Sequence, residues 1–265
     1  MRLAVITDIH GNIHALEAVL RDIEVQAVDQ IVVAGDTVNI LPHSKVCWDP
    51  VMALGFPVLE GNHEYYLYTY GTPSAPPEWT QERFKGLAWL RDQFSDADVL
   101  AMQALPMTYT LPDLLVTHAS PRSLFDNVLV DTPTGSLREM FGDVDEMLIV
   151  RGHNHKWNKH RWDGHALVTV ASSGLPLTGR HEAQYLLLEK RQHWRYKKRL
   201  VAYDLEAALA TMDDAYLEHY GPVGKIFKRK LRTARGHTLP FLAQYLEPID
   251  RSELSLARAV EQFLS

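Results

Sequence analysis

The sequence predicts an α/β fold with a parallel sheet, followed by a helical C-terminal region. In the first third of the chain, short apolar runs alternate with segments whose apolar residues recur at helical spacing. Most of the apolar runs end in Gly, Asp, Asn or His. In parallel α/β sheets, polar residues at the carboxyl ends of the strands gather in one crevice. From Asp204 onward, apolar residues recur every three or four positions, which indicates helices.

The composition is that of a folded soluble protein. The chain has 265 residues, of which 46% are hydrophobic and 23% charged, with a formal net charge of -6. That charge argues against a stable complex with nucleic acid, whose phosphates attract a basic surface. The single cysteine, Cys47, excludes an intramolecular disulfide and fits a reducing compartment. The N-terminus reaches Asp8 too early for a signal peptide, and no apolar run approaches the ~18 residues of a membrane span. We therefore expect a cytoplasmic protein with no membrane contact.

The first part of the chain predicts βα units. The expected elements, in order, are a strand over 3–6, a helix carrying Ile13, Leu16, Leu20 and Ile23, a strand over 31–34, a helix from Asp49-Pro50 to Gly55 and a strand over 57–59. Strands joined by helices imply parallel pairing with right-handed crossovers.

The rest of the chain predicts a mixture of strands and helices. A Pro-rich loop over 71–77 is followed by a helix over 79–94, strands over 114–116 and 147–150, a hairpin of 156–162 and 166–170 around Asp163-Gly164, and strands over 185–188 and 194–201. We divide the chain into a domain over 1–204 and a helical extension over 205–265. The extension is expected to pack on the domain or on a second subunit, which makes a homo-oligomer an open alternative, and to supply no catalytic group.

Five of the predicted strands are followed by side chains that can bind a metal. These are Asp8 and His10, then Asp36, then Asn62 and His63, then His118, and then His153 and His155. An isolated His or Asp at a strand end is usually a turn former. The ordered series Asp-x-His, Gly-Asp, Gly-Asn-His-Glu, Thr-His and Gly-His-x-His indicates a metal site instead.

The residue types indicate which metals and how many. Imidazole nitrogen mixed with carboxylate oxygen suits Mn, Fe, Co or Zn better than Mg or Ca. Four His, two Asp and one Asn exceed the needs of one ion, and they fit two ions about 3.5 to 4 Å apart that share a bridging carboxylate. We expect the glycines of Gly35-Asp36, Gly61-Asn62 and Gly152-His153 to let the backbone turn sharply beside the ligands.

These motifs resemble those of the calcineurin-like metallophosphoesterases, in particular the small prokaryotic phosphodiesterase branch. The resemblance rests on Asp8 to Asn12 (DIHGN), Gly35-Asp36, Gly61 to Glu64 (GNHE), His118 and Gly152 to His155 (GHNH), and spans roughly residues 1–204. It implies a two-sheet β-sandwich flanked by helices with a dimetal site at its rim. It also implies that one ion takes Asp8, His10, Asp36 and His155, that the other takes Asp36, Asn62, His118 and His153, and that His63 is the catalytic histidine facing the leaving group.

The chain departs from the protein phosphatases of this superfamily after Asp36. Asn39 and Ile40 stand where those enzymes have an Asp that pairs with the catalytic His and an Arg that binds phosphate. This argues against a protein phosphatase. We expect Asn39 to accept a hydrogen bond from His63 instead, with Glu64 and Asn12 as further residues near the substrate or the ligands.

The function that the sequence favours is a dimetal phosphodiesterase in which a metal-activated hydroxide attacks phosphorus and His63 protonates the leaving oxygen. The expected substrate is a small nucleotide-type phosphodiester, either a cyclic nucleotide or a dinucleoside polyphosphate, and the expected cofactor is two divalent ions, Mn before Fe, Co or Zn. A nonspecific phosphomonoesterase is the alternative, and a non-catalytic scaffold of the same fold is a weaker one. Arg122, Arg151 and Arg180 are candidates for replacing the missing arginine charge.

Overall fold

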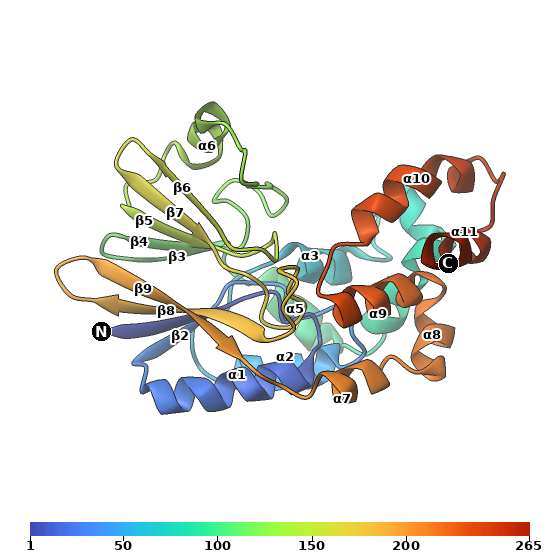
Figure 1. Ribbon diagram of the computed structural model, residues 1–265, viewed down its shortest axis with the longest axis horizontal. Coiled ribbons are helices and arrows are strands. Elements are labelled where there is room, and N and C mark those ends of the chain that lie inside the picture. The colour runs from blue at the N-terminus through green and yellow to red at the C-terminus, as the bar shows by residue number, and fades with distance from the viewer.

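The computed structural model describes residues 1–265 and contains two mixed sheets, packed face to face (Figure 1). The four-stranded sheet has the order β2 (Gln30–Val33), β1 (Arg2–Ile6), β8 (Ala183–Lys190) and β9 (Trp194–Val201). The five-stranded sheet has the order β3 (Thr108–Leu111), β4 (Leu114–Thr117), β5 (Leu148–Arg151), β7 (His165–Thr169) and β6 (Asn158–Trp162). Pairs β1–β2, β4–β5 and β5–β7 are parallel, whereas the other neighbours are antiparallel. The two-sheet sandwich is confirmed.

The side chains of β1 point alternately to the two faces of the four-stranded sheet, and both faces are covered. Leu3 and Val5 point into the core between the sheets, where they meet Val116 and Val150. Ala4 and Ile6 belong to the core on the other face, under α1 (Ile13–Gln26) and α2 (Ser44–Ala53). Because successive side chains of a strand point to opposite faces, a strand covered on both faces is apolar throughout.

Helices cover the outer faces of the sandwich (Figure 1). Helices α1 and α2 lie on the four-stranded sheet, and α6 (Thr134–Phe141) packs on the five-stranded sheet through Leu137 and Phe141. Helix α7 (Leu205–Ala210) contacts α1. No helix combines the length and apolar character that crossing a membrane requires.

The remaining helices gather at one end of the sandwich (Figure 1). They are α3 (Asn62–Thr69), η1 (Pro77–Thr80), η2 (Glu82–Phe84), α4 (Lys85–Arg91), α5 (Asp96–Gln103), α8 (Asp214–Tyr220), α9 (Val223–Thr233), α10 (Thr238–Asp250) and α11 (Leu256–Leu264). One apolar core joins α3, α4 and α5 to α7, α8 and the end of α9, and a smaller core lies among α9, α10 and α11. The helical C-terminal region therefore packs on the sandwich domain.

Two predicted helices differ from the structure. The predicted helix over 79–94 is broken into two short 3₁₀ turns and α4, because Trp79 packs on both Tyr66 and Phe84 at 5.3 and 6.1 Å between ring centroids. Residues five apart in a helix point about 140° away from each other, so a continuous helix would separate Trp79 from Phe84. The helix predicted from Asp49 begins earlier, at Ser44.

The strand predictions are mostly confirmed. The exception is 57–59, which forms only a single bridge, from Val58 to Val33. The hairpin β6–β7 turns at Asp163-Gly164, and both turn residues have positive φ, at 46° and 88°. That backbone matches the two-residue turns that connect twisted antiparallel strands.

Candidate metal centre

All seven predicted ligands lie at one rim of the sandwich. Asp8 and His10 follow β1, and Asp36 follows β2. The ligands from the other segments are Asn62 at the first residue of α3, His118 just after β4, and His153 and His155 after β5. The parallel pairs β1–β2 and β4–β5 bring these segments together, because parallel strands end at the same edge of a sheet.

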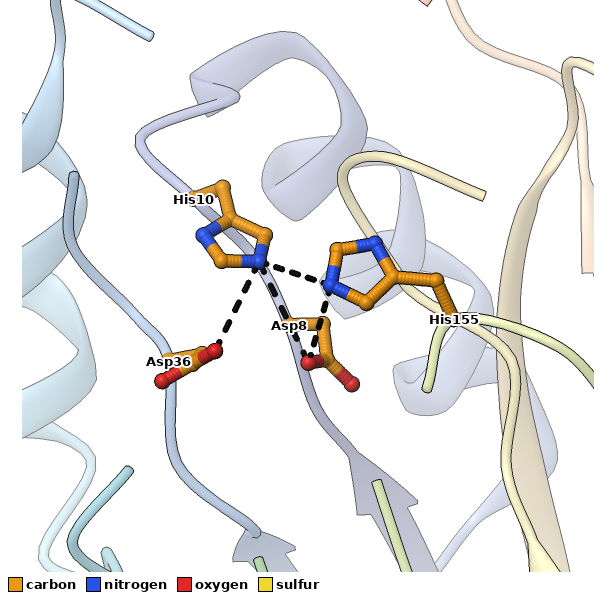
Figure 2. Close-up of side chains that lie close together, drawn as sticks. All are labelled: Asp8, His10, Asp36 and His155. Atoms are coloured by element: carbon orange, nitrogen blue, oxygen red, sulfur yellow. Dashed lines mark hydrogen bonds and ion pairs between the residues drawn. The ribbon is translucent and has the colours of Figure 1, made fainter. Parts of the chain in front are cut away.

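One cluster consists of Asp8, His10, Asp36 and His155 (Figure 2). Their ligand atoms lie within 4.8 Å of one another, and all four residues are buried. His155 Nε2 is 3.0 Å from His10 Nε2 and 3.2 Å from Asp8 Oδ1. His10 Nε2 is 3.7 Å from Asp36 Oδ2. These four are the residues that the family resemblance implies for one ion.

A second cluster lies on the other side of Asp36. His118 Nε2 is 3.4 Å from Asp36 Oδ2 and 3.0 Å from Asn62 Oδ1. His153 Nδ1 is 2.9 Å from the same Asn62 oxygen. Asp36 Oδ2 therefore lies close to His10 of the first cluster and to His118 of the second.

Backbone carbonyls fix the tautomers of three histidines. Nδ1 of His118 lies 2.8 Å from Ala34 O, Nδ1 of His155 lies 2.8 Å from Leu175 O, and Nδ1 of His10 lies 3.4 Å from a carbonyl. A ring nitrogen facing a carbonyl carries the proton, so Nε2 of each ring presents a lone pair to the cluster. This is the arrangement that a metal-binding histidine needs.

The donor set fits cations. With the tautomers above, His10 Nε2 and His155 Nε2 are both hydrogen-bond acceptors, yet they lie 3.0 Å apart. His118 Nε2 and Asn62 Oδ1 are also two acceptors at 3.0 Å. Asp8 Oδ1 is buried and has no hydrogen-bond partner. Acceptors forced together in a buried site repel one another unless a cation lies between them, so both clusters suit divalent ions with nitrogen and oxygen ligands.

Burial favours the neutral imidazoles that a metal requires. It lowers the pKa of His118 to about 4 and, with the neighbouring charge of His118, that of His153 to about 2. It also lowers the pKa of His10, together with the charges of His63 and His155. The histidines are therefore deprotonated at neutral pH and do not need to lose a proton when they bind an ion.

The ligands themselves adopt the turned backbone that was expected of the neighbouring glycines. Positive φ occurs at five of the candidate ligands: Asp8 (55°), His10 (52°), Asp36 (56°), His153 (72°) and His155 (56°). Gly61 and Gly152 do not have positive φ. Glycine is needed at these two positions because a Cβ would lie 2.2 Å from Asp36 Oδ1 at Gly61 and 2.0 Å from a threonine hydroxyl at Gly152. The expectation that all three glycines supply the turns was wrong, and strain is stored in the ligands.

Glu64 supports the loop that carries Asp36. Its fully buried carboxylate accepts hydrogen bonds from the backbone N–H groups of Asp36 (2.8 Å), Thr37 (2.7 Å), Val38 (3.3 Å) and Gly61 (2.9 Å). Burial nevertheless raises the pKa of Glu64 to about 7. Burial and the charge of Glu64 also raise the pKa of Asp36. Glu64 therefore positions the bridging residue and does not face a substrate.

His63 lies on α3 with Nε2 3.9 Å from Asp36 Oδ2. The expected hydrogen bond from His63 to Asn39 is absent, because Asn39 Oδ1 accepts from Ile40 N at 2.7 Å and from Tyr220 O–H at 3.1 Å. His63 Nδ1 is buried without a partner. Burial, followed by the charges of His155 and Lys230, lowers the pKa of His63.

Asn12 is a structural residue. Its side-chain oxygen caps α1 by accepting from Ala15 N at 3.1 Å, and its amide nitrogen donates to Gly174 O at 2.7 Å. Both ends of the amide are therefore occupied, and Asn12 joins the start of α1 to the loop that contains Gly174.

Lys230 of the C-terminal region was not among the predicted site residues. It is only 9% exposed, and the carboxylates of Asp8 and Asp36 act on its charge. The signal was present in the sequence, because Lys230 follows Val223 and Ile226 on the apolar face of a helix, where a lysine is out of place.

Comparison with known families agrees with this geometry. The profile of the calcineurin-like phosphoesterase superfamily domain matches residues 1–193. The chain belongs to this superfamily. It is thus a metallophosphoesterase with a buried Asp/His cluster at the position where the family holds its metals, and the resemblance read from the motifs is confirmed.

Solved relatives of this phosphoesterase share its fold. The crystal structure of a metallophosphoesterase from Sphaerobacter thermophilus is 25% identical with a TM-score of 0.72, covering 88% of this chain and 100% of that chain. That coverage exceeds residues 1–193, so part of the C-terminal region has a counterpart there. A hypothetical protein of Pyrococcus horikoshii has the same TM-score at 17% identity, covering 85% and 97% of the two chains. An uncharacterised protein of Methanocaldococcus jannaschii is 22% identical over 236 residues, which is 78% of this chain and 89% of the relative.

Proposed function

We propose that this metallophosphoesterase is a phosphodiesterase that binds two divalent transition-metal ions, Mn in preference, and hydrolyses a nucleotide-type phosphodiester such as a cyclic nucleotide or a dinucleoside polyphosphate. The observation that carries the proposal is Asp36 Oδ2, which lies 3.7 Å from His10 Nε2 and 3.4 Å from His118 Nε2, between two separate sets of ligand atoms. One ion would take Asp8, His10, Asp36 and His155. The other would take Asp36, Asn62, His118 and His153.

The protein's own residues have distinct tasks in this reaction. When bound, two ions supply an activated water and positive charge for the phosphoryl oxygens. Asp36 would contribute a ligand to both ions, and Glu64 fixes the backbone of Asp36. His63 donates its ring N–H to the leaving oxygen. The negative charge of a bound phosphate raises the pKa of His63 against the effect of burial, which lets the ring carry the proton that the leaving group takes.

The preference for diesters rests on the turn after Asp36. Ile40 is apolar and 3% exposed, with φ of 77°, and it occupies the position where an arginine binds phosphate in the protein phosphatases. A phosphomonoester is nearly a dianion at neutral pH and needs more positive charge than a diester does. A nonspecific phosphomonoesterase is the alternative that the same metal centre allows.

Hydrolysis of two nitrophenyl esters tests the preference. We expect a higher catalytic efficiency on bis(nitrophenyl) phosphate than on nitrophenyl phosphate with Mn added under identical salt conditions. A tenfold higher efficiency on the monoester would establish the alternative. Ile40→Arg should shift the ratio of the two catalytic efficiencies toward the monoester. If neither ester is hydrolysed in a metal-dependent way, the alternative that fits is a non-catalytic scaffold of the same fold.

Metal analysis of Asp36→Ala tests the bridge. Wild-type protein should hold about two ions per chain, and the variant should lose both, because a bridging ligand belongs to both coordination shells. Two retained ions with full activity would show that Asp36 does not bridge.

Leaving-group dependence tests His63. A general acid contributes about 10²- to 10⁴-fold when the departing oxygen is basic and little when the leaving group is a stable anion. His63→Ala should therefore reduce hydrolysis of a ribose-leaving diester far more than that of a nitrophenyl diester. Equal losses would assign His63 to substrate binding or ligand support.

A further inference from the structure

The C-terminal helices reach the loops that carry the metal ligands. On one side, Tyr216 O–H of α8 donates to Ile40 O at 3.0 Å, in the turn that follows Asp36. On the other side, Gly179 N donates to Ala234 O at 2.9 Å, which ties the end of α9 to the loop between β7 and β8. That loop also supplies the carbonyl that orients His155. The C-terminal end of α9 therefore contacts the loop that orients one of the candidate metal ligands.

Lys230 brings a positive charge to this place. It lies on the buried face of α9 and makes no hydrogen bond or ion pair with another residue, whereas Lys228 in the same helix donates to a backbone carbonyl at 2.6 Å. An ammonium whose donors have no protein partner is free to bind an anion. Burial lowers the pKa of Lys230 to about 8, and the carboxylates of Asp8 and Asp36 oppose that shift. These two carboxylates are therefore close enough to act on the charge of Lys230.

The three arginines that could have replaced the missing phosphate-binding residue are otherwise engaged. Arg122 and Arg180 pair with neighbouring carboxylates at 2.9 and 2.5 Å. Arg151 is fully buried and donates to two backbone carbonyls at 2.6 and 2.7 Å. The charge of Arg151 acts on Asp8, His118 and His153, but its guanidinium N–H groups donate to protein atoms, so the expectation that an arginine restores the charge stays a prediction. Lys230 is the cation near the centre whose donors are not used.

A cavity of about 430 Å³ lies beside His63, between α3 to α4 on one side and α8 to α11 on the other. Its volume is that of a small-molecule site. Ile40 and His63 line it together with the aromatic side chains Tyr66, Trp79, Phe84, Tyr220, Phe227 and Phe241. Aromatic walls favour a flat ring that can stack or pack edge-on.

Polar residues also line this cavity. Asn39, Glu78, Arg83 and Thr238 stand among its lining residues. A ring that carries donors and acceptors on its edge can pair with such groups, whereas a plain hydrocarbon cannot.

We propose that the C-terminal helices complete the substrate site: the cavity binds the nucleobase-type ring of one ester arm, and the Lys230 ammonium contacts the phosphate. This inference rests on the proposed phosphodiesterase function. His63 connects the two parts, because it lines the cavity and its Nε2 lies 3.9 Å from Asp36 Oδ2. Ile226 of α9 also lines the cavity, and Lys230 lies about one helical turn, 5.4 Å, further along the same face.

Calorimetric binding of inorganic phosphate, adenosine and adenosine monophosphate to the Mn-loaded protein tests the proposal without relying on turnover. Lys230→Met keeps the apolar stem and removes the charge. It should weaken phosphate and the monophosphate about 10- to 100-fold, as expected for a lost charged hydrogen bond, and leave adenosine unchanged. Lys228→Met, which removes a charge from the same helix, should change none of the three. Unchanged phosphate affinity in Lys230→Met at full metal occupancy would overturn the role of Lys230.

The cavity is tested by filling it. Leu246 of α10 lines the cavity, and Leu246→Trp should weaken adenosine and the monophosphate at least tenfold while leaving inorganic phosphate unchanged. Gln244→Trp places the same ring on the exposed side of the same helix and is the control.

The outcomes separate this inference from the proposed function. Three results would overturn the assignment of the cavity to a nucleobase-type ring, whatever the enzyme hydrolyses. These are no adenosine binding to the wild-type protein, an unchanged adenosine affinity in Leu246→Trp, and preferential binding of a long-chain alkyl phosphate. Failure of the wild-type protein to hydrolyse any diester would remove the phosphodiesterase function, and the adenosine result would still decide whether the cavity binds a nucleobase-type ring.

Discussion

Glu64 is the residue whose removal should couple fold stability to metal binding most directly. Its two carboxylate oxygens accept four backbone hydrogen bonds, from Asp36, Thr37, Val38 and Gly61. In Glu64→Gln one oxygen becomes an NH₂ group, which faces two N–H donors that it cannot satisfy. The shape of the side chain is otherwise unchanged, so the variant isolates the hydrogen bonds from the packing.

The magnitude follows from those contacts. Each buried N–H that loses its acceptor costs about 1–3 kcal/mol, so two of them cost about 2–6 kcal/mol. The substitution also removes a carboxylate that is unfavourable to bury, as its pKa of about 7 shows. We therefore expect a loss of about 2–4 kcal/mol in the free energy of unfolding, a large part of a typical 5–15 kcal/mol. Losing a hydrogen bond that orients a metal ligand typically weakens metal binding about 10- to 100-fold, so we expect the Mn affinity of Glu64→Gln to fall by that factor.

Urea unfolding of the metal-free protein, followed by circular dichroism, measures the stability, and calorimetric titration with Mn measures the affinity. Glu60→Gln is the matched control, because Glu60 is also buried but accepts a hydrogen bond only from Tyr68 O–H, at 2.7 Å, which a glutamine oxygen still accepts. It should cost at most about 1 kcal/mol and leave Mn affinity unchanged. A loss below about 0.5 kcal/mol in Glu64→Gln, with wild-type Mn affinity, would refute the reasoning.

Two further predictions concern stability. Burial tends to raise the pKa of Asp22, but hydrogen bonds from Arg199 at 2.6 and 3.1 Å and from a tyrosine lower it. A carboxyl whose pKa is lowered by folding stabilises the fold above its unfolded pKa of about 3.9, and this contribution is lost as the pH falls through the folded pKa. Asp22→Asn should therefore cost about 1–3 kcal/mol of unfolding free energy at pH 7 and much less at pH 2. Urea unfolding midpoints at the two pH values measure the difference. At Gly174 a Cβ would lie 1.8 Å from Ile9 O, so Gly174→Ala should destabilise the fold and weaken Mn binding, whereas Gly135→Ala, with open space around it, should do neither; equal unfolding temperatures for the two variants would contradict this.

The candidate metal ligands could be collected from sequence because each is marked by the residues next to it. A buried strand is an apolar run in the sequence, and a polar residue follows it. Asp36 stands beside a Gly, whereas Asp8 and His118 do not, and all three were visible without knowing which strands pair. Strands of a parallel sheet end at one edge, which made it reasonable to collect the ligands in one site. The same local signals located the β6–β7 hairpin, because Asp163-Gly164 fits the positive φ of a tight turn.

The tertiary structure decided which side chains support the ligands and which complete the site. Glu64 was recognised only as a neighbour of His63, and its bonds to the loop of Asp36 arise from the docking of α3 against the end of β2. Asn39 was expected to orient His63, yet Tyr220, from a segment far along the chain, takes its side-chain oxygen. Lys230 and the cavity beside His63 exist only because the C-terminal helices fold back onto the rim of the sandwich. Such contacts join residues far apart in sequence, and apolar periodicity encodes that a helix has a buried face without encoding which surface covers it.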